Sequence, residues 1–494
     1  MKSKARPPMA MHLRYPQSKK QVDPSYFLLA IGCLAFVAML LLAAKAATAD
    51  EHPPGEGPAL GERLTQERIE SGELSLLELR REGRRIFSTP FNRLDGYGDG
   101  PMDPSDPLEP GNRPTLQNNG MTLRVNGLDA QSCLECHGVV SNLTIPARFG
   151  VGGVGGIGAN VLAGPSDIDV DDSDGNGFAN FDGRYINPPF VFGSGGVELL
   201  GKEMTRTLQR LKEEARQNPG SDVPLVAKGV SFGTILFQNG QFDTSRVEGV
   251  DDDLVVRPFG RKGEFTSVRD FAIGAMQFHF GMQPSEIVGD GIDDDGDGTA
   301  DEILVGELSA VHVFGTTTER PRRRGATPES RTGFETFQAI GCAECHTPFL
   351  TTHSKELTYS FPEVATDPDA NVYMSVDLTA TPMGFREHPG RDGIVVPLFA
   401  DLKRHDMGDR LAEGTDDELA REFTTARLWG VADTAPYLHD GRASTLTEAI
   451  HYHGGEARNS RDAFFALTEN HRSAVLAFLR TLRTPERVGV DLDG

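Results

Sequence analysis

Apolar residues recur at helical spacing in several separated stretches of this 494-residue chain, and each stretch predicts an amphipathic helix. The predicted helices span residues 75–82, 197–217, 266–280 and 473–482. A further short helix should run into Cys342, because Gly333, Phe337 and Gly341 follow one another every four residues. The segments between them are long and contain many of the 56 glycines and 31 prolines. The pattern therefore predicts a mainly α fold with long irregular loops.

The longest uncharged apolar run lies near the N-terminus, at residues 26–44, and follows a leader that carries six lysines and arginines. A run of this length is close to the ~20 residues that span a bilayer, and the small residues at 44–49 form acceptable cleavage sites. Residues 1–49 are therefore either a cleaved signal peptide or a retained membrane anchor. Both alternatives place the rest of the chain outside the cytoplasm.

One pentapeptide pattern, Cys-x-x-Cys-His, occurs twice and is typical of covalent c-type haem attachment. Two thiols on one turn bond to the porphyrin, and the adjoining histidine ligates the iron. A zinc ribbon would place its two cysteine pairs about 15–20 residues apart, and a thioredoxin-like site needs neither a second pair nor the histidines. The sequence thus predicts two covalently attached haem c groups, held by Cys133, Cys136 and His137 and by Cys342, Cys345 and His346.

Charge and cysteine content narrow the picture further. The net charge of −23 argues against a nucleic-acid partner, and an acidic face would suit a basic electron-donor protein, although acidity also simply favours solubility. Only Cys33, inside the apolar run, lies outside the two motifs, so no disulfide framework is expected.

The basic, proline-containing stretch at 320–328 is the best candidate for a domain boundary. We expect a first haem domain with acidic loops over residues 50–320 and a second, cytochrome c-like haem domain over residues 325–494. In the second domain the helix at 473–482 could cross the helix before Cys342, which would bury a porphyrin economically.

A histidine near the C-terminus is a candidate sixth ligand of the second haem iron. Thr445 and Glu448 form a capping box, and on the helix that begins there Leu446, Ile450 and His453 share one face. His453 therefore ends an apolar stripe. It is either an ordinary core histidine or an iron ligand.

The stretch from Leu428 to Gly441, with its Pro-Tyr-Leu-His-Asp-Gly turn, resembles the second haem domain of the bacterial di-haem cytochrome c peroxidase superfamily. The resemblance covers most of residues 75–485 and is closest to the peroxidase-like di-haem oxidoreductase branch. It implies that the axial ligand of the second haem stands fourteen positions after His439, which is His453. Most relatives have methionine or tyrosine there, and histidine would lower the potential.

Around the first haem the spacing of the peroxidase motif is kept, but the residues that carry its chemistry are replaced. Within 261–282, Arg261 stands where the peroxidases carry a bridging tryptophan, Phe271 replaces a glutamine and Gly281 replaces a glutamate. His279 and Gln277 are then the nearest groups that could move a proton during peroxide cleavage. Alternatively, His279 or Met282 could ligate the first iron, or His279 could be a plain buried histidine.

An acidic loop at 293–301 predicts a calcium site. Asp293, Asp295, Asp297 and Asp301 occupy positions 1, 3, 5 and 9 with glycine at position 6, as in EF-hand loops, but Leu304 stands where such a loop has its bidentate glutamate. A weaker copy covers 172–183. A solvated acidic turn is the alternative in both cases.

Together these features predict a periplasmic or otherwise extracytoplasmic di-haem oxidoreductase, tethered to the inner membrane if the apolar run is kept. Electrons from a small cytochrome, a cupredoxin or a quinol-linked chain would enter at the second haem (His346, His453) and pass to the first (His137), where a small oxidant binds. The alternatives are a non-catalytic electron-transfer cytochrome with both irons six-coordinate, and a haem-dependent oxygenase acting on an organic substrate.

Overall fold

The computed structural model describes residues 56–98, 132–137, 187–413 and 419–485. The predicted leader at 1–49 and the weaker acidic loop at 172–183 lie outside these ranges. The chain divides into Met1–Gly57 and Pro58–Gly494, and every described helix and strand belongs to the second unit. Among the described helices, none is both long enough and apolar enough to cross a membrane.

A helix pair, α3 (Leu76–Ser88) and α9 (Val305–Thr316), forms one side of the larger hydrophobic core. The helix α3 begins at Ser75 in a capping box with Glu78, as its sequence favours. The two helices approach closely at Gly83, where a β-carbon would lie 2.0 Å from the carbonyl oxygen of Ala310. Only glycine permits this approach.

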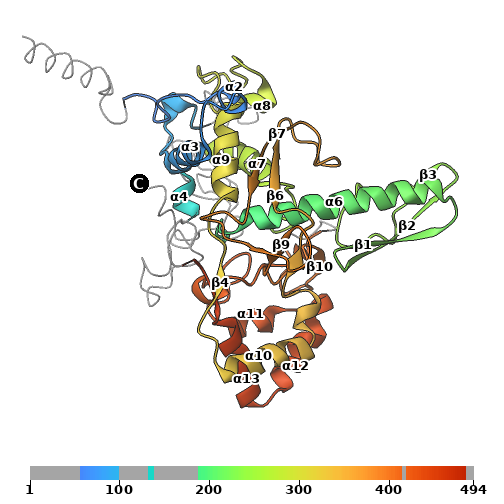
Figure 1. The fold of residues 1–494 in the computed structure, drawn as a ribbon. Helices are drawn as coiled ribbons and strands as arrows, with labels where there is room; N and C mark the ends of the chain where they lie inside the picture. The colour runs from blue at the N-terminus through green and yellow to red at the C-terminus, as the bar shows by residue number, and fades with distance from the viewer. Residues whose placement is uncertain (1–55, 99–131, 138–186, 414–418, 486–494) are drawn as a thin grey trace, which may run out of the picture. The chain divides into compact units, whose positions relative to one another are not determined.

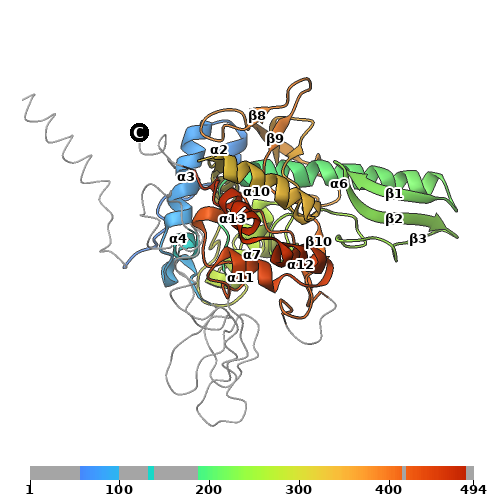
Figure 2. The same cartoon turned by 90° about the horizontal axis from the view of Figure 1, so that it is seen from below.

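The long helix α6 (Ser194–Gln217) confirms the helix predicted at 197–217. Its N-terminal half is buried in the same core, and its C-terminal half carries a three-stranded antiparallel sheet of β1 (Asp222–Ala227), β2 (Val230–Gln238) and β3 (Gln241–Asp243). Figures 1 and 2 show this sheet lying along the far end of α6.

The prediction of a mainly α fold is wrong. Helices take up 36% and strands 16% of the described residues, and the strands form several small sheets. The remaining strands are β4 (Arg322–Arg323), β5 (Leu350–Thr351), β6 (Glu356–Ser360), β7 (Val372–Asp377), β8 (Arg386–Glu387), β9 (Ile394–Val396), β10 (Arg404–Asp406), β11 (Glu422–Thr424) and β12 (Leu482–Arg483).

The missed sheet on α6 had a readable turn signal. Lys228-Gly229 and Asn239-Gly240 both have positive φ at their two positions, 48° and 84° in the first and 54° and 81° in the second. Such pairs match the type I′ turn, whose twist suits a β-hairpin, and Asn-Gly is its strongest sequence signal. Alternating burial along β1 confirms that one face of the sheet packs inward.

A second, smaller core lies around the other haem motif. The helices α10 (Pro328–Ala339) and α13 (Glu469–Leu479) cross at Gly333, where a β-carbon would lie 1.8 Å from the carbonyl oxygen of Ala474. This confirms the predicted crossing of the two helices (Figure 1). The same core includes Phe337, Phe464 and Phe478.

Short elements complete the described chain. The helix predicted at 266–280 is present as α7 (Val268–Ala275), which continues into the π-helix η3 (Met276–Phe280). The others are α2 (Gln66–Glu70), η1 (Arg93–Asp95), α4 (Cys133–Cys136), α8 (Ser285–Val288), η4 (Cys342–Glu344), η5 (Val431–Asp433), α11 (Leu446–Tyr452), η6 (Gly455–Ala457) and α12 (Arg458–Ala466).

The basic stretch at 320–328 is packed against the second core. Within it, β4 pairs with β12, and the guanidinium of Arg323 lies over the rings of Phe334 and Phe478, at 5.5 and 5.2 Å. Because of these contacts, the stretch at 320–328 is not a solvent-exposed linker. The division of the chain near residue 320 stays a prediction.

Candidate functional site

Both Cys-x-x-Cys-His motifs open onto one continuous cavity of ≈ 1350 Å³. A cleft for a single ligand usually measures about 300–1,000 Å³, so this cavity is large enough for more than one large cofactor. Its wall is largely aromatic and aliphatic, as a porphyrin requires, and includes Phe87, Phe265, Phe271, Phe280, Phe337 and Leu446. All four motif cysteines line the cavity.

His137 in the first motif is prepared to ligate a metal. It directly follows α4, and its Nδ1 lies 2.7 Å from the carbonyl oxygen of Pro189. That hydrogen bond places the ring proton on Nδ1 and leaves Nε2 with its lone pair free. Burial lowers the pKa of His137, which keeps the ring neutral and able to bind iron.

His346 in the second motif is held in the same way. Its Nδ1 donates to the carbonyl oxygen of Phe399 at 3.2 Å. Burial, with a smaller contribution from the nearby His453, lowers the pKa of His346 to about 4. The imidazole is therefore a neutral ligand at physiological pH.

His453 faces His346 across the cavity. It stands at the C-terminal end of α11, and its Nδ1 lies 2.8 Å from the carbonyl oxygen of Ala449. The two imidazole centroids are 6.3 Å apart. Two histidines on opposite sides of one metal need about 6.3 Å, since each metal–nitrogen bond is about 2.0–2.1 Å and each nitrogen lies about 1.1 Å from its ring centre. The spacing thus fits a single iron between the two rings.

The predicted catalytic pair lies on η3, but only one member reaches the cavity. His279 is half-buried and lines the cavity, whereas Gln277 is exposed and is not among the lining residues. A π-helix is uncommon and is frequently found at functional sites. Gly281, which ends it, has φ 60° and ψ 29°, a left-handed conformation that costs an L-residue about 1–2 kcal/mol. This backbone disfavours the glutamate that relatives carry there.

The wall beside His137 is aromatic. The ring of Phe271 lies edge-on to the imidazole at 6.0 Å, and Phe265 packs against Phe271 at 5.2 Å. Phe87 also lies close, with its ring centroid 6.4 Å from that of the imidazole. The first haem site is therefore drier than one with a glutamine at 271.

Arg261, which stands where the peroxidases have a tryptophan, is connected to His439 through the Glu413 carboxylate. Its Nε lies 2.8 Å from Oε1 of Glu413, and the same oxygen lies 3.1 Å from Nε2 of His439. Glu413 is 3% exposed, and the ring of His439 stacks on Phe423 at 4.7 Å. Burial lowers the pKa of His439 to about 4. No sequence motif contains Glu413, so its place in the site was not predictable.

Another link joins the segment that contacts His137 to the turn before α11. Asn187 stands two residues before Pro189, the acceptor for His137. The Asn187 side chain donates to the carbonyl oxygens of Pro436 and Leu438, at 2.9 and 3.0 Å, in the turn that precedes α11. The segment that fixes His137 is thus tied to the turn that leads into α11, the helix that ends at His453.

His405 also lines the cavity and was missed from the sequence. Its Nδ1 lies 2.7 Å from Oε2 of Glu456, and its Nε2 lies 2.8 Å from Oδ2 of Asp401. Although burial alone would lower its pKa, the hydrogen bond to the Asp401 carboxylate raises the pKa of His405. The His405 side chain also lies close to Cys345. Only the four-residue spacing of Asp401 and His405 hints at this pairing.

A buried polar cluster behind the cavity wall also escaped the sequence analysis. Nε2 of His312 lies 2.9 Å from both carboxylate oxygens of Glu198, and the Glu363 carboxylate is close by. The Lys202 ammonium lies 3.1 Å from the Glu198 carboxylate and balances its negative charge, so the carboxylate does not require a metal ion. Nδ1 of His312 has no partner among the described residues, whereas a metal-ligating histidine normally has one there. The cluster fits a structural ion-pair network that joins α6 to α9.

The acidic loop brings together three of the four predicted calcium ligands. One oxygen of each of Asp293, Asp295 and Asp297 lies within 4.8 Å of the others. Asp301 has a different role, since its Oδ1 accepts the backbone N–H of Gly291 at 2.7 Å.

Comparison with known proteins gives three findings. Residues 391–482 match the family described as "Di-haem oxidoreductase, putative peroxidase". A MauG-like protein associated with microbial copper homeostasis matches with 17% identity and a TM-score of 0.22, covering 36% of this chain and 53% of its own. Hydrazine synthase of Kuenenia stuttgartiensis, pressurised with xenon, matches with 19% identity and a TM-score of 0.20, covering 36% of this chain and 55% of its own. The chain thus spans about half the length of each. No curated protein matches significantly.

Proposed function

We propose that the chain is a peroxidase-like c-type di-haem oxidoreductase, because residues 391–482 match the di-haem oxidoreductase family, in agreement with the sequence resemblance. The observation that carries the proposal is the single cavity lined by both haem motifs. Bound haem would supply one-electron chemistry and, where an axial position is open, a site for a small oxidant.

The two motifs are not equivalent, and this gives the proposed direction of electron flow. The second motif offers two facing imidazoles, His346 and His453, which would fill both axial positions of its iron. The first offers His137 in an aromatic wall, and His279 is the other histidine from its side of the cavity. An iron with both axial positions filled would transfer electrons without binding a substrate. An iron with one protein ligand would leave a position where the oxidant could bind. Covalent haem attachment and the N-terminal leader support an extracytoplasmic location.

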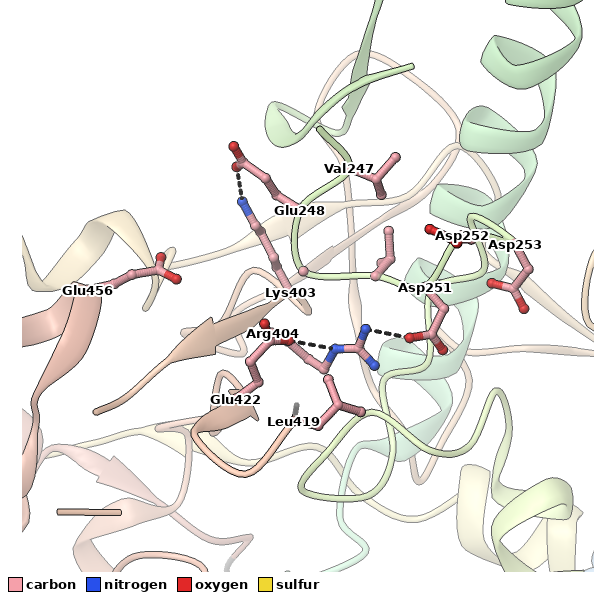
Figure 3. Close-up of a pocket in the computed structure, with 12 residues that line it drawn as sticks. Val247, Glu248, Asp251, Asp252, Asp253, Lys403, Arg404, Leu419, Glu422 and Glu456 are labelled. Atoms are coloured by element: carbon pink, nitrogen blue, oxygen red, sulfur yellow. Dashed lines mark hydrogen bonds and ion pairs between the residues drawn. The ribbon is translucent and has the colours of Figure 1, made fainter. Parts of the chain in front are cut away.

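An acidic cleft is the proposed entry point for the electron donor. It has a volume of ≈ 750 Å³ and six carboxylates against two cations, Lys403 and Arg404 (Figure 3). Both cations are neutralised within the cleft, Lys403 by Glu248 at 3.0 Å and Arg404 by Asp251 at 2.5 Å. The six carboxylates are Glu248, Asp251, Asp252, Asp253, Glu422 and Glu456.

The cleft lies next to the second haem site. Glu456 lines both the cleft and the cavity, and its carboxylate binds His405 beside Cys345. The lining residues carry six carboxylates and two cations, and Arg257, whose guanidinium lies 2.5 Å from Asp253 and 3.1 Å from Asp251, offsets one further charge. The resulting formal charge of −3 (six less two less one) would attract a partner with a basic face. A small basic cytochrome c or cupredoxin fits this requirement, and its electron would enter at the second haem.

We expect Asp252→Lys to slow electron transfer from a small basic cytochrome c by about fivefold or more at low salt, because it reverses a charge in the cleft. The difference should nearly vanish at about 1 M salt, where the Debye length is about 3 Å. Stopped-flow reduction at several ionic strengths measures both. Asp367→Lys, an equal charge change at an exposed site outside the cleft, is the control and should show a smaller effect. Equal effects of the two variants would remove the cleft from donor binding.

The proposed oxidant site is tested by two variants on η3. We expect His279→Ala to slow the reaction of the half-reduced protein with hydrogen peroxide by about 10²-fold or more, because the cavity loses its proton-transfer group. Gln277→Ala should react like the unchanged protein, since Gln277 is exposed and does not line the cavity. Stopped-flow absorbance of the haem band gives both rates. A His279→Ala protein that reacts at the original rate would exclude His279 from the chemistry.

One observation favours a second candidate, a pure electron-transfer cytochrome. Phe271 and Gly281 stand where peroxidases have their glutamine and glutamate, and the left-handed backbone at Gly281 disfavours a side chain there. If His279 bound the first iron, both irons would be six-coordinate. Such a protein would exchange electrons but would not react with peroxide.

A further inference from the structure

Of the described residues, three arginines line the cavity that the two haem motifs share, and one of them lacks a counter-charge. Arg261 and Arg461 each form an ion pair with a carboxylate, at 2.8 Å in both cases. Arg427 forms no ion pair with any described residue, and its one hydrogen-bond partner among them is the carbonyl oxygen of Pro258, at 3.1 Å. A guanidinium has five N–H donors, so most of those of Arg427 are available to another group.

The Arg427 guanidinium is charged and poorly solvated. Part of the side chain is buried, and the side chain lines the cavity. Burial lowers the pKa of Arg427 to about 10, and no neighbouring carboxylate offsets that shift. The guanidinium still stays protonated at neutral pH, because this pKa lies well above the pH. A partly desolvated charge without a partner is costly, so an anion that enters the cavity would be bound there favourably.

The segment that carries Arg427 is anchored to the wall of the first haem site. Thr424 donates its backbone N–H to the carbonyl oxygen of Arg261 at 2.9 Å. The guanidinium of Arg427 lies 5.9 Å from the centre of the Phe259 ring, and Phe259 exchanges two backbone hydrogen bonds with Phe265, a residue of the aromatic wall. Arg427 therefore has a defined place on the cavity wall that does not depend on a carboxylate of the protein.

A bound haem would bring the anion that Arg427 lacks. Each c-type haem carries two propionate carboxylates on the edge opposite the vinyl groups that the cysteines bind. The propionates therefore lie away from α4 and η4, where the two motifs stand. Arg427 belongs to neither element but to the segment between β11 and η5. Arginine matches a carboxylate better than lysine does, because its planar fork forms two parallel N–H···O bonds.

We propose that the guanidinium of Arg427 binds a propionate carboxylate of one of the two haems. The inference rests on covalent haem attachment, which is part of the proposed function, and adds a binding residue that no motif contains. Either haem can be the source, because Arg427 is held at the wall of the first haem site while the next residue, Leu428, packs against the second core. The positive charge of Arg427 disfavours the extra positive charge of an oxidised iron. Arg427 therefore raises the reduction potential of the haem whose propionate it binds.

The test is a potentiometric titration of the Arg427→Gln holoprotein, after its haem content has been measured. Glutamine keeps an N–H that can donate to the Pro258 carbonyl, so the variant should fold and carry two haems. One of the two potentials should fall by the equivalent of about a tenfold change in the reduction equilibrium, which is about 59 mV for one electron. Absorption and electron paramagnetic resonance spectra recorded during the titration identify the haem that is affected, and so the propionate that is bound. Arg427→Lys keeps the charge and should lower the same potential by the equivalent of less than about threefold.

Arg421→Gln is the matched control on the same segment. It removes an equal charge, but Arg421 is exposed, does not line the cavity, and pairs with Asp406 and Asp409 at 3.3 Å. Both potentials should stay within about a twofold change of the equilibrium. Unchanged potentials in Arg427→Gln, or an equal fall in Arg427→Lys or Arg421→Gln, would overturn this inference while two haems per chain leave the proposed function standing. A chain without covalent haem would overturn both.

Discussion

Replacing both cysteines of one haem motif by alanine is expected to remove one covalent haem and leave the other. Covalent attachment needs both thiols on one turn, and the two motifs stand on separate elements, α4 and η4. The Cys133→Ala/Cys136→Ala protein and the Cys342→Ala/Cys345→Ala protein should each carry about half the haem of the unchanged protein per chain. Pyridine haemochrome absorbance after denaturation measures this.

The fifth cysteine gives the control for this experiment. Cys33→Ala should keep both haems, because Cys33 lies outside the two motifs. The removal of both motifs together should leave no covalent haem. Retention of two haems after the loss of either cysteine pair would contradict covalent attachment at that motif.

The second large effect is expected at His453, the proposed axial ligand of the second haem. His453→Met should raise the reduction potential of that haem by on the order of 0.2 V, since axial ligands tune haem potentials over about 0.8 V and methionine raises the potential relative to histidine. The structural basis is the 6.3 Å between the imidazole centroids of His346 and His453. Potentiometric titration followed at the haem absorption bands measures both potentials in one experiment.

His451 is the matched control two residues earlier on α11. It packs against Phe465 and does not line the cavity. His451→Met should therefore leave both potentials within a few tens of millivolts of their original values, within the small effects expected of residues that do not touch the iron. If His453→Met left the second potential unchanged, His453 would not be the ligand.

Local sequence patterns predicted the parts of the site that depend on neighbouring residues. The capping box of Thr445 and Glu448 and the helix that presents His453 are present as expected. The close crossing at Gly333 was also readable from glycine and phenylalanine spacing. These features are set within one or two helical turns, where side-chain periodicity decides the structure.

Features that depend on distant parts of the chain were not predictable from one sequence. Glu413 is 152 residues from Arg261, and Glu198 is 114 residues from His312, so neither pairing leaves a local pattern. The polar groups become partners only because folding buries them together.

The small sheets were missed for a different reason. The turn pairs Lys228-Gly229 and Asn239-Gly240 were readable, but the strands of the second half are only two to six residues long. Segments of this length have too few positions for an alternating pattern to stand out. The prediction of a mainly α fold therefore followed from counting the long helices alone.

The measurement that tests the central claim most directly is electron paramagnetic resonance of the holoprotein, oxidised and half-reduced, before and after addition of peroxide. The account predicts one low-spin signal from the second haem, with His346 and His453 on its iron, and one high-spin signal from the first. The high-spin signal should be lost when the half-reduced protein meets peroxide. Two low-spin signals that peroxide leaves unchanged in both states would contradict an open first haem and would identify the protein as an electron carrier.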